Sequence, residues 1–180
     1  IRLLTQLKTL DVSHNRLTHI PSLLELPDLE EYNWNGNPFQ SLDSDIRTVK
    51  LEPRDWRERR QQLAQLRNIQ VFEELPGYFY SYGSNKDSSD LSWLAQNSDL
   101  HTLRLHTKTN IGSYIFHFAN LRHISVRSCE LRSLNLSAKS IKQLEYLDIS
   151  QNYFTTLPAF LRNCSNLVHL EAEDATRSRR

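Results

Sequence analysis

Apolar and polar residues alternate along this chain in a short pattern that recurs seven times. The template is Leu-x-x-Leu-x-Leu-x-x-Asn-x-Leu, in which other apolar residues can stand for Leu. The pattern begins at Leu7, Leu29, Leu66, Leu100, Leu121, Leu144 and Leu167, so its starts step by 22, 37, 34, 21, 23 and 23 residues. One match can be chance, but seven in nearly constant phase indicate an internal repeat. The two long steps flank the third copy.

The centre of each copy predicts a short β-strand, because its apolar and polar residues alternate with a period of two. The apolar pairs expected in the strands are Leu10 and Val12, Tyr32 and Trp34, Ile69 and Val71, Leu103 and Leu105, Ile124 and Val126, Leu147 and Ile149, and Leu170 and Ala172. Neighbouring copies then lay their strands side by side as a parallel sheet. The Asn position is filled by Asn15, Asn37, Glu74, Lys108, Cys129 and Asn152.

On these residues the chain resembles the leucine-rich-repeat family, strongly at 7–39 and 121–170 and less at 40–99. The resemblance implies an α/β solenoid, a curved horseshoe with a parallel concave β-sheet and an irregular convex side with short helices. It implies a single domain over 1–180, with about seven repeats and insertions near 40–65 and 73–99. It also implies a structural ladder, in which Asn15, Asn37 and Asn152 bond backbone groups in the turns and Cys129 is a small buried substitute.

The repeat length gives an expectation about the compartment. Steps of 22 and 23 residues, with Ile20-Pro21 and Leu157-Pro158 in the turns, resemble intracellular classes: Ras-pathway scaffolds, fungal adenylyl cyclases and repeat-containing protein phosphatases. That likeness favours the cytoplasm. The extracellular alternative is favoured by two Asn-x-Ser sequons, of which Asn135 is the better candidate for glycosylation, and by Arg177-Ser178-Arg179-Arg180, which looks like a dibasic processing site.

The irregular middle holds two further candidates. Ile46, Val49 and Leu51 predict a degenerate strand, and a helix with a basic outer face follows from Asp55 to Leu66. The second insertion gathers aromatic residues, and Ser89 or Asp90 is expected to cap a short helix through Trp93 and Leu94. Long loops with aromatic residues favour binding. We therefore include Tyr78, Tyr80 and Tyr82 among the residues expected to contact a partner, although these rings could equally fill a gap in an irregular repeat.

The polar positions of the strands predict a binding surface on the concave face. The fourth and fifth repeats are basic there, and the sixth and seventh are acidic, which favours a partner of complementary charge. Phe72 is an apolar exception in a concave position. The residues expected on this surface, besides the tyrosines, are Phe72, His101, Arg104, His106, Arg122, His123, Arg127, Asp148 and Glu171.

The chain carries little that points to catalysis. It has no phosphate-binding glycine loop, no nucleophile elbow and no Cys or His at zinc-ligand spacing, so we expect neither an enzyme nor a metal or other cofactor. The net charge of +1 makes nucleic acid an improbable partner, and no apolar stretch is long enough to span a membrane. Two cysteines cannot form a disulfide scaffold.

These observations predict a non-catalytic regulatory or scaffold module that binds a protein through the concave sheet face and the adjacent loop. One alternative is a fragment of an extracellular receptor or matrix protein. Another is a phosphate- or RNA-binding surface built from arginines. Because terminal repeats of a solenoid expose apolar core, we also expect further repeats, a capping domain or an oligomer contact to cover the ends.

Overall fold

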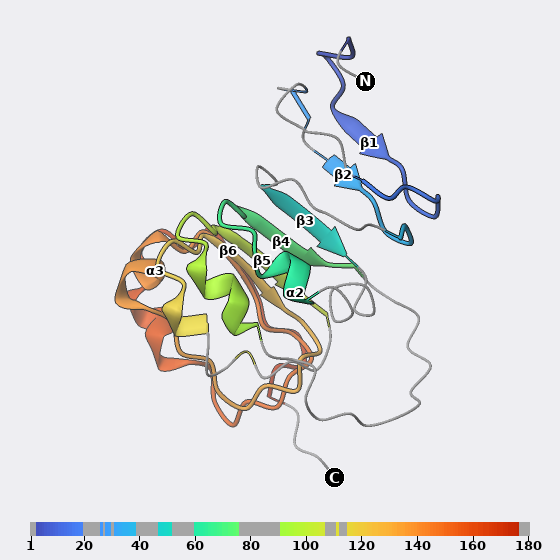
Figure 1. Cartoon of the computed structure of the whole chain (residues 1–180). Coiled ribbons are helices and arrows are strands. Elements are labelled where there is room, and N and C mark those ends of the chain that lie inside the picture. The colour runs from blue at the N-terminus through green and yellow to red at the C-terminus, as the bar shows by residue number, and fades with distance from the viewer. Residues whose placement is uncertain are drawn as a thin grey trace.

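The computed structural model describes residues 3–19, 26, 28–29, 31–38, 47–51, 60–75, 91–106, 111 and 115–176. Within them, eight short strands run in chain order and pair in parallel. β1 (Thr9–Asp11) pairs with β2 (Glu31–Asn33). A six-stranded sheet follows, made of β3 (Thr48–Leu51), β4 (Val71–Glu74), β5 (Thr102–Leu105), β6 (His123–Val126), β7 (Tyr146–Asp148) and β8 (His169–Glu171). This is the parallel sheet of a curved solenoid, as the repeat predicted (Figure 1).

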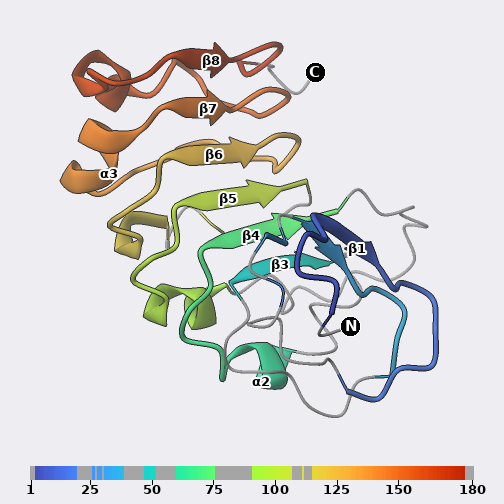
Figure 2. The same ribbon diagram turned by 90° about the horizontal axis from the view of Figure 1, so that it is seen from above.

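Short helical turns return the chain from one strand to the next. They are α2 (Arg60–Leu63), η2 (Ser92–Gln96), η4 (Ile115–His117), α3 (Ala138–Gln143) and η5 (Ala159–Asn163), where η denotes a 3₁₀ helix. Among them, α3 lies on the side of the sheet where the strands begin (Figure 2). Ser137 caps α3, because its side-chain oxygen accepts a hydrogen bond from the Ser140 N–H. No helix in the described ranges has the length and hydropathy needed to cross a membrane.

The core is a stack of apolar side chains, one from each repeat, at the same position of successive strands. In the six-stranded sheet the register aligns Val49, Phe72, Leu103, Ile124, Leu147 and Leu170. The first five of these side chains are completely buried, whereas Leu170 is 45% exposed. Each repeat therefore buries its apolar residues against its neighbours, as expected for a solenoid.

The turn after each of several strands places one residue in the left-handed conformation, directly before the ladder position. The left-handed residues are His14, Gly36, Ser128, Gln151 and Asp174, and they precede Asn15, Asn37, Cys129, Asn152 and Ala175. Gly36 is the one position in this set where the space also matters. A Cβ there would lie 2.7 Å from Nδ1 of His14, so a larger residue would clash with the preceding repeat.

The ladder residues join neighbouring repeats through the backbone. Asn152 donates to the carbonyls of Val126 and Ile149, both at 2.8 Å, and its oxygen accepts from the Leu131 N–H at 2.9 Å. Asn37 donates to the carbonyls of Val12 at 2.8 Å and Trp34 at 2.9 Å. These amides provide partners for backbone groups that the tight turns leave without a strand neighbour, which buried backbone requires.

Asn15 and Cys129 fill the same position with different contacts. Asn15 is exposed and bonds only within its own repeat, to the carbonyls of Val12 and Ser13 at 3.0 Å. The buried Cys129 thiol donates to the carbonyls of Arg127 at 3.4 Å and Leu105 at 3.6 Å. A carbonyl of the preceding repeat thus finds a donor at Cys129 as it does at Asn152.

The register of the third repeat is wrong in the sequence-based prediction. We expected Ile69 and Val71 to be the buried pair of the strand, but β4 pairs Phe72 with Leu103 and Val71 with Thr102. Ile69 therefore stands in the position that precedes the strand, three residues earlier in the template. The error arose because two overlapping apolar patterns fit this segment, and only the pairing with β5 distinguishes them.

Phe72 is consequently a core residue and not part of the concave surface. Its side chain is completely buried and packs edge-on against Trp93 of η2, with ring centroids 5.7 Å apart. Glu74 is likewise not the ladder residue. It continues the strand and is completely buried, and its Oε2 accepts a hydrogen bond from the His106 N–H at 2.8 Å.

Candidate interaction surface on the concave face

Side chains that point away from the core form two rows across the sheet, because alternate residues of a strand face opposite sides. We call this side the concave face. The first row is Thr48, Val71, Thr102, His123, Tyr146 and His169, and the second is Lys50, Glu73, Arg104, Ser125, Asp148 and Glu171. Neighbouring strands lie about 4.8 Å apart, so polar side chains of adjacent repeats can touch. Three polar clusters result.

The first cluster joins β3, β4 and β5. Glu73 lies between two cations: its Oε2 is 3.5 Å from Nζ of Lys50, and its Oε1 is 3.6 Å from a terminal guanidinium nitrogen of Arg104. The Glu73 carboxylate is mostly covered, whereas nearly half of the Arg104 side chain is exposed. Among these three residues, Arg104 is the most exposed.

The second cluster lies at the N-terminal ends of β5, β6 and β7. Glu145 binds Arg122 at 3.3 Å and Nε2 of His123 at 3.6 Å. The Thr102 hydroxyl lies 3.0 Å from Nδ1 of His101 and 3.4 Å from Nδ1 of His123. Burial lowers the pKa of His101, and the neighbouring His123 and Arg122 lower it further, so the neutral ring is favoured.

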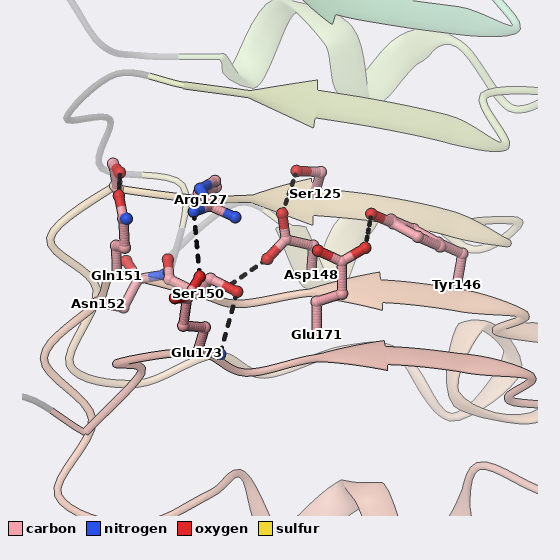
Figure 3. A network of polar contacts seen from close by, with 10 residues as sticks. Ser125, Arg127, Tyr146, Asp148, Ser150, Gln151, Asn152, Glu171 and Glu173 are labelled. Atoms are coloured by element: carbon pink, nitrogen blue, oxygen red, sulfur yellow. Dashed lines mark hydrogen bonds and ion pairs between the residues drawn. The ribbon is translucent and has the colours of Figure 1, made fainter.

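The third cluster runs from β6 to β8 and the turns that follow them (Figure 3). The buried Asp148 accepts from the Ser125 hydroxyl at 3.2 Å and from the Ser150 N–H at 2.9 Å. The Ser150 hydroxyl in turn accepts from the Glu173 N–H at 3.2 Å, and the Glu173 carboxylate binds Arg127 at 3.4 Å. Arg127 is thus held over the turn after β6 by a partner two repeats away.

Tyr146 ties β7 to the last strand. Its hydroxyl donates to Oε1 of Glu171 at 2.8 Å. Burial raises the pKa of Tyr146 to about 12, and the hydrogen bond and negative charge of Glu171 act in the same direction. The phenol therefore stays protonated at neutral pH and remains a donor to the carboxylate.

A polar strip also lies on β1 and β2, which form a separate two-stranded sheet. Asp11 accepts from the Ser13 hydroxyl at 2.6 Å and from the Asn33 amide at 3.0 Å. The Asn33 oxygen accepts in turn from the Asn35 amide at 2.6 Å. The bonds from Ser13 are the largest influence that lowers the pKa of Asp11, so this strip carries a negative charge.

The basic and acidic halves predicted from the sequence meet in the structure. Arg122 and His123 of the basic half bind Glu145 of the acidic half, and Arg127 binds Glu173. Arg104 forms an ion pair with Glu73. The sequence analysis did not predict this pair because it aligned the third repeat incorrectly. The concave face therefore combines opposite charges at its centre, and its side chains are held in place by neighbours in the next repeat.

The other predicted site residues are placed as follows. His106 is half-buried after β5, close to the carboxylate of Glu74 that its backbone binds. Tyr78, Tyr80 and Tyr82 lie outside the described residues. The sequence analysis missed Lys50, Glu73 and Tyr146 as members of the surface. Aligning Phe72 with Leu103 would have placed Glu73 beside Arg104.

The described ranges also bear on metal binding and cysteine reactivity. They contain no group of three or more His, Cys, Asp or Glu side chains that could hold a metal ion. Both cysteines are free, and burial raises the pKa of the Cys164 thiol, which disfavours the reactive thiolate. Asn135 is exposed two residues before the cap of α3, and Asn163 is exposed at the end of η5.

Two stretches of the repeat match a known protein family. The family model "Leucine Rich Repeat" matches residues 6–26 and 143–164. No curated protein matches the sequence. Among solved structures, the chain is similar to a leucine-rich-repeat protein of Leptospira interrogans, with 18% sequence identity and a TM-score of 0.47, covering 96% of this chain and 50% of that one. It is also similar to a chain in the Toll–Spätzle complex of Drosophila, with 17% identity and a TM-score of 0.47. That match covers 95% of this chain and 27% of the other, so the chain spans at most half the length of either.

Proposed function

Since this chain is a leucine-rich-repeat protein, we propose that it is a non-catalytic scaffold or regulatory module that binds a protein partner through the concave face. The repeat fold suggests a protein-interaction module in general. The proposal adds the surface and the chemistry of the partner. It is carried by one observation, the rows of charged side chains that the stacked strands hold in register.

The ion pairs of this surface are poorly explained by stability alone. Pairs between exposed side chains contribute only about 0–1 kcal/mol each to folding. Yet Arg104, Arg122 and Arg127 each have a carboxylate within 4.0 Å on another repeat. Such contacts restrict long side chains before a partner arrives, and this lowers the entropy that binding costs. The arrangement supports a role in recognition.

The charges also suggest how the partner is oriented. The cations lie over β5, directly before β6 and in the turn after β6, at Arg104, Arg122 and Arg127, and the carboxylates lie near β7 and β8, at Glu145 and Glu173. A protein with an acidic segment facing the arginines and a basic segment facing the carboxylates would complement both. A phosphate backbone fits less well, because each of these arginines already has a carboxylate beside it.

Affinity capture from a cell lysate tests the proposal. We compare the wild-type chain with Arg104→Glu plus Arg127→Glu, and with the control Lys139→Glu plus Lys142→Glu. The control changes the charge equally but on the exposed side of α3. We expect one protein to be retained by the wild type and the control, and lost from the concave variant. Equal capture by all three chains contradicts the concave face as the binding surface.

A second candidate function is a ligand-binding ectodomain. The observation in its favour is that Asn135 and Asn163, which begin the two sequons, are both exposed. The repeat length favours the cytoplasm, so the two proposals differ in compartment. Mass spectrometry of the chain from its native source distinguishes them: a glycan on Asn135 supports the ectodomain, and an unmodified Asn135 supports the cytoplasmic scaffold.

A further inference from the structure

Two histidines of the second cluster share one hydroxyl group, and we call His101 and His123 the histidine pair. The Thr102 oxygen lies 3.0 Å from Nδ1 of His101 and 3.4 Å from Nδ1 of His123. The backbone holds the two residues together, because the His101 carbonyl accepts from the N–H of Arg122 at 2.8 Å and from that of His123 at 3.0 Å. Thr102 is buried and both histidines are half-buried, so solvent reaches the rings but the hydroxyl between them is covered.

The shared hydroxyl links the protons of the two rings. A hydroxyl group has one proton, so Thr102 can donate to only one Nδ1. If neither Nδ1 carried a proton, the lone pair of the second ring would face the Thr102 oxygen without a hydrogen between them. At least one ring must therefore donate from Nδ1 to Thr102. The protonation of one histidine then determines the tautomer of the other.

Glu145 lies beside the other nitrogen of one ring. Its Oε2 is 3.6 Å from Nε2 of His123, whereas Nδ1 of the same ring faces Thr102. A proton on Nε2 of His123 is therefore directed at a carboxylate. When Nδ1 also gains a proton, His123 becomes a cation that donates to Glu145 and to Thr102 at the same time, and hydrogen bonds between charged groups are the stronger ones.

Two arrangements of protons satisfy all of these contacts. In the neutral arrangement, His101 donates from Nδ1 to Thr102, and Thr102 donates to Nδ1 of His123. When His123 takes up a proton from water, its Nδ1 donates to Thr102 instead. The hydroxyl then turns toward Nδ1 of His101, which loses its proton to water as Nε2 gains one. Each of these atoms keeps a partner in both arrangements, so the backbone need not move.

The charged and titratable groups around the histidine pair come from three strands and their approaches. They are Asp99 before β5, Arg104 one row along β5, Arg122 before β6, Glu145 before β7 and Tyr146 in β7. On β4 the residue in the same row is Val71, which is uncharged. Tyr146 has a pKa raised to about 12, so it stays neutral.

These surroundings favour one proton on the pair over two. Burial lowers the pKa of His101, and His123 and Arg122 lower it further, whereas Asp99 acts in the opposite direction. Two protons would place two cations on one hydroxyl group. Interacting groups of this kind titrate in separate steps. The first proton therefore resides on His123, where Glu145 is its counter-ion.

We propose that the histidine pair is a pH-sensitive switch that controls whether Glu145 is available to a basic segment of the partner. The inference rests on the proposed function, which places such a segment against the carboxylates. At neutral pH the half-exposed Glu145 has one cation beside it, Arg122, and attracts a further positive charge. As the pH falls through the ordinary histidine pKa of about 6.5, His123 becomes a second cation on Glu145. The basic segment is then released.

NMR of the imidazole nitrogens in the free chain tests the link between the rings without a partner. We expect His101 to change from the Nδ1–H to the Nε2–H form over the same pH range in which His123 gains its proton. Thr102→Val removes the hydroxyl and nearly keeps the shape of the side chain, and it should abolish this change of tautomer. Thermal unfolding shows that the variant is folded. A constant tautomer of His101 in the wild type overturns the switch.

Binding of a poly-lysine peptide tests the effect on the surface. The wild type should bind it about fivefold more weakly at pH about 5.5 than at pH about 7.5, because one charge at this distance changes affinity by roughly that factor in water. His123→Gln cannot take up the proton and should lose most of the difference. His117→Gln is the matched control, since His117 is exposed in η4, outside the sheet, and it should keep the difference.

Glu145→Gln distinguishes a failure of the switch from a failure of the proposed function. This variant should bind poly-lysine weakly at both pH values. If Glu145→Gln weakens binding but the wild type binds equally at both pH values, the surface stands and the switch is wrong. If neither the pH nor Glu145→Gln changes binding, both proposals are wrong. A pH difference that persists in His123→Gln also overturns the switch.

Discussion

The repeats of β6 and β7 and the repeats of β3 and β4 place side chains at the same positions but fill them differently. β6 uses the apolar pair Ile124 and Val126, which are both completely buried. β4 uses Phe72 and Glu74, so a carboxylate stands where the register of its neighbours places an apolar side chain. A buried position in a solenoid therefore requires a partner for each polar atom more than it requires a particular residue type.

The largest expected effect concerns Phe72. Replacement by Ala should lower the free energy of unfolding by about 3–5 kcal/mol, because the ring is completely buried against Trp93. Urea denaturation measures the change, with Phe116→Ala as an exposed control that should change stability little. A small effect at Phe72 would contradict its burial and would support the register of β4 that was predicted from the sequence.

The next effect sharpens the comparison at Glu74. Glu74→Ala leaves the His106 N–H without the acceptor it has at 2.8 Å, which should cost about 1–3 kcal/mol. Glu74→Gln keeps an oxygen acceptor and should cost less. The same denaturation experiment measures both variants. If Ala and Gln destabilise equally, the hydrogen bond to His106 is not what Glu74 contributes.

The ladder provides a third test within the regular repeats. Asn152→Ala removes four hydrogen bonds to buried backbone groups and should lower the free energy of unfolding by about 1–3 kcal/mol. Cys129→Ala should cost less, because thiol hydrogen bonds are weaker than those of an amide and Ala175 already occupies this position in the last repeat. Thermal unfolding compares the two. Equal losses would mean that the turn needs volume rather than hydrogen bonds.

The ion pairs of the two regions, one at β3 and β4 and the other near β6 and β7, are expected to differ by smaller free energies. Double-mutant cycles on Lys50–Glu73 should give a larger coupling than on Arg122–Glu145, because the first pair is mostly covered and the second is largely exposed. For the exposed pair we expect about 0.2–1 kcal/mol, decreasing with added salt. Couplings of equal size would show that burial does not separate the two clusters.

The smallest effect is a dependence on pH. The pKa of His101 is lowered by burial and by His123 and Arg122, so the unfolded chain binds its proton at a higher pH than the folded chain. His101 therefore contributes stability above the ordinary histidine pKa of about 6.5, and this contribution is lost as the pH falls. His101→Gln should flatten that part of the stability profile. An NMR titration that finds an ordinary pKa for His101 would contradict the assignment.

Much of this architecture could be predicted from the sequence, because several copies of the repeat carry the same pattern of apolar residues. The strands around Leu103, Ile124 and Leu147 and the turns at Asn37 and Asn152 lie where the template predicts them. The degenerate strand expected from Val49 and Leu51 also forms, as β3. In each case the apolar period is supported by neighbours in the same phase, so a single irregular residue does not change the interpretation.

Two features were decided only by the tertiary structure. One is the register of β4, and the other is which charged side chains of the concave face form pairs. Ile69, Val71 and Phe72 fit two overlapping patterns, and stacking on β5 selects the one that buries Phe72. The sequence supplied the charged residues of the concave face, but residues such as Arg127 and Glu173 are 46 positions apart and become partners only when three repeats stack. Local periodicity specifies which side of a strand faces inward, whereas the pairing between strands specifies which side chains meet.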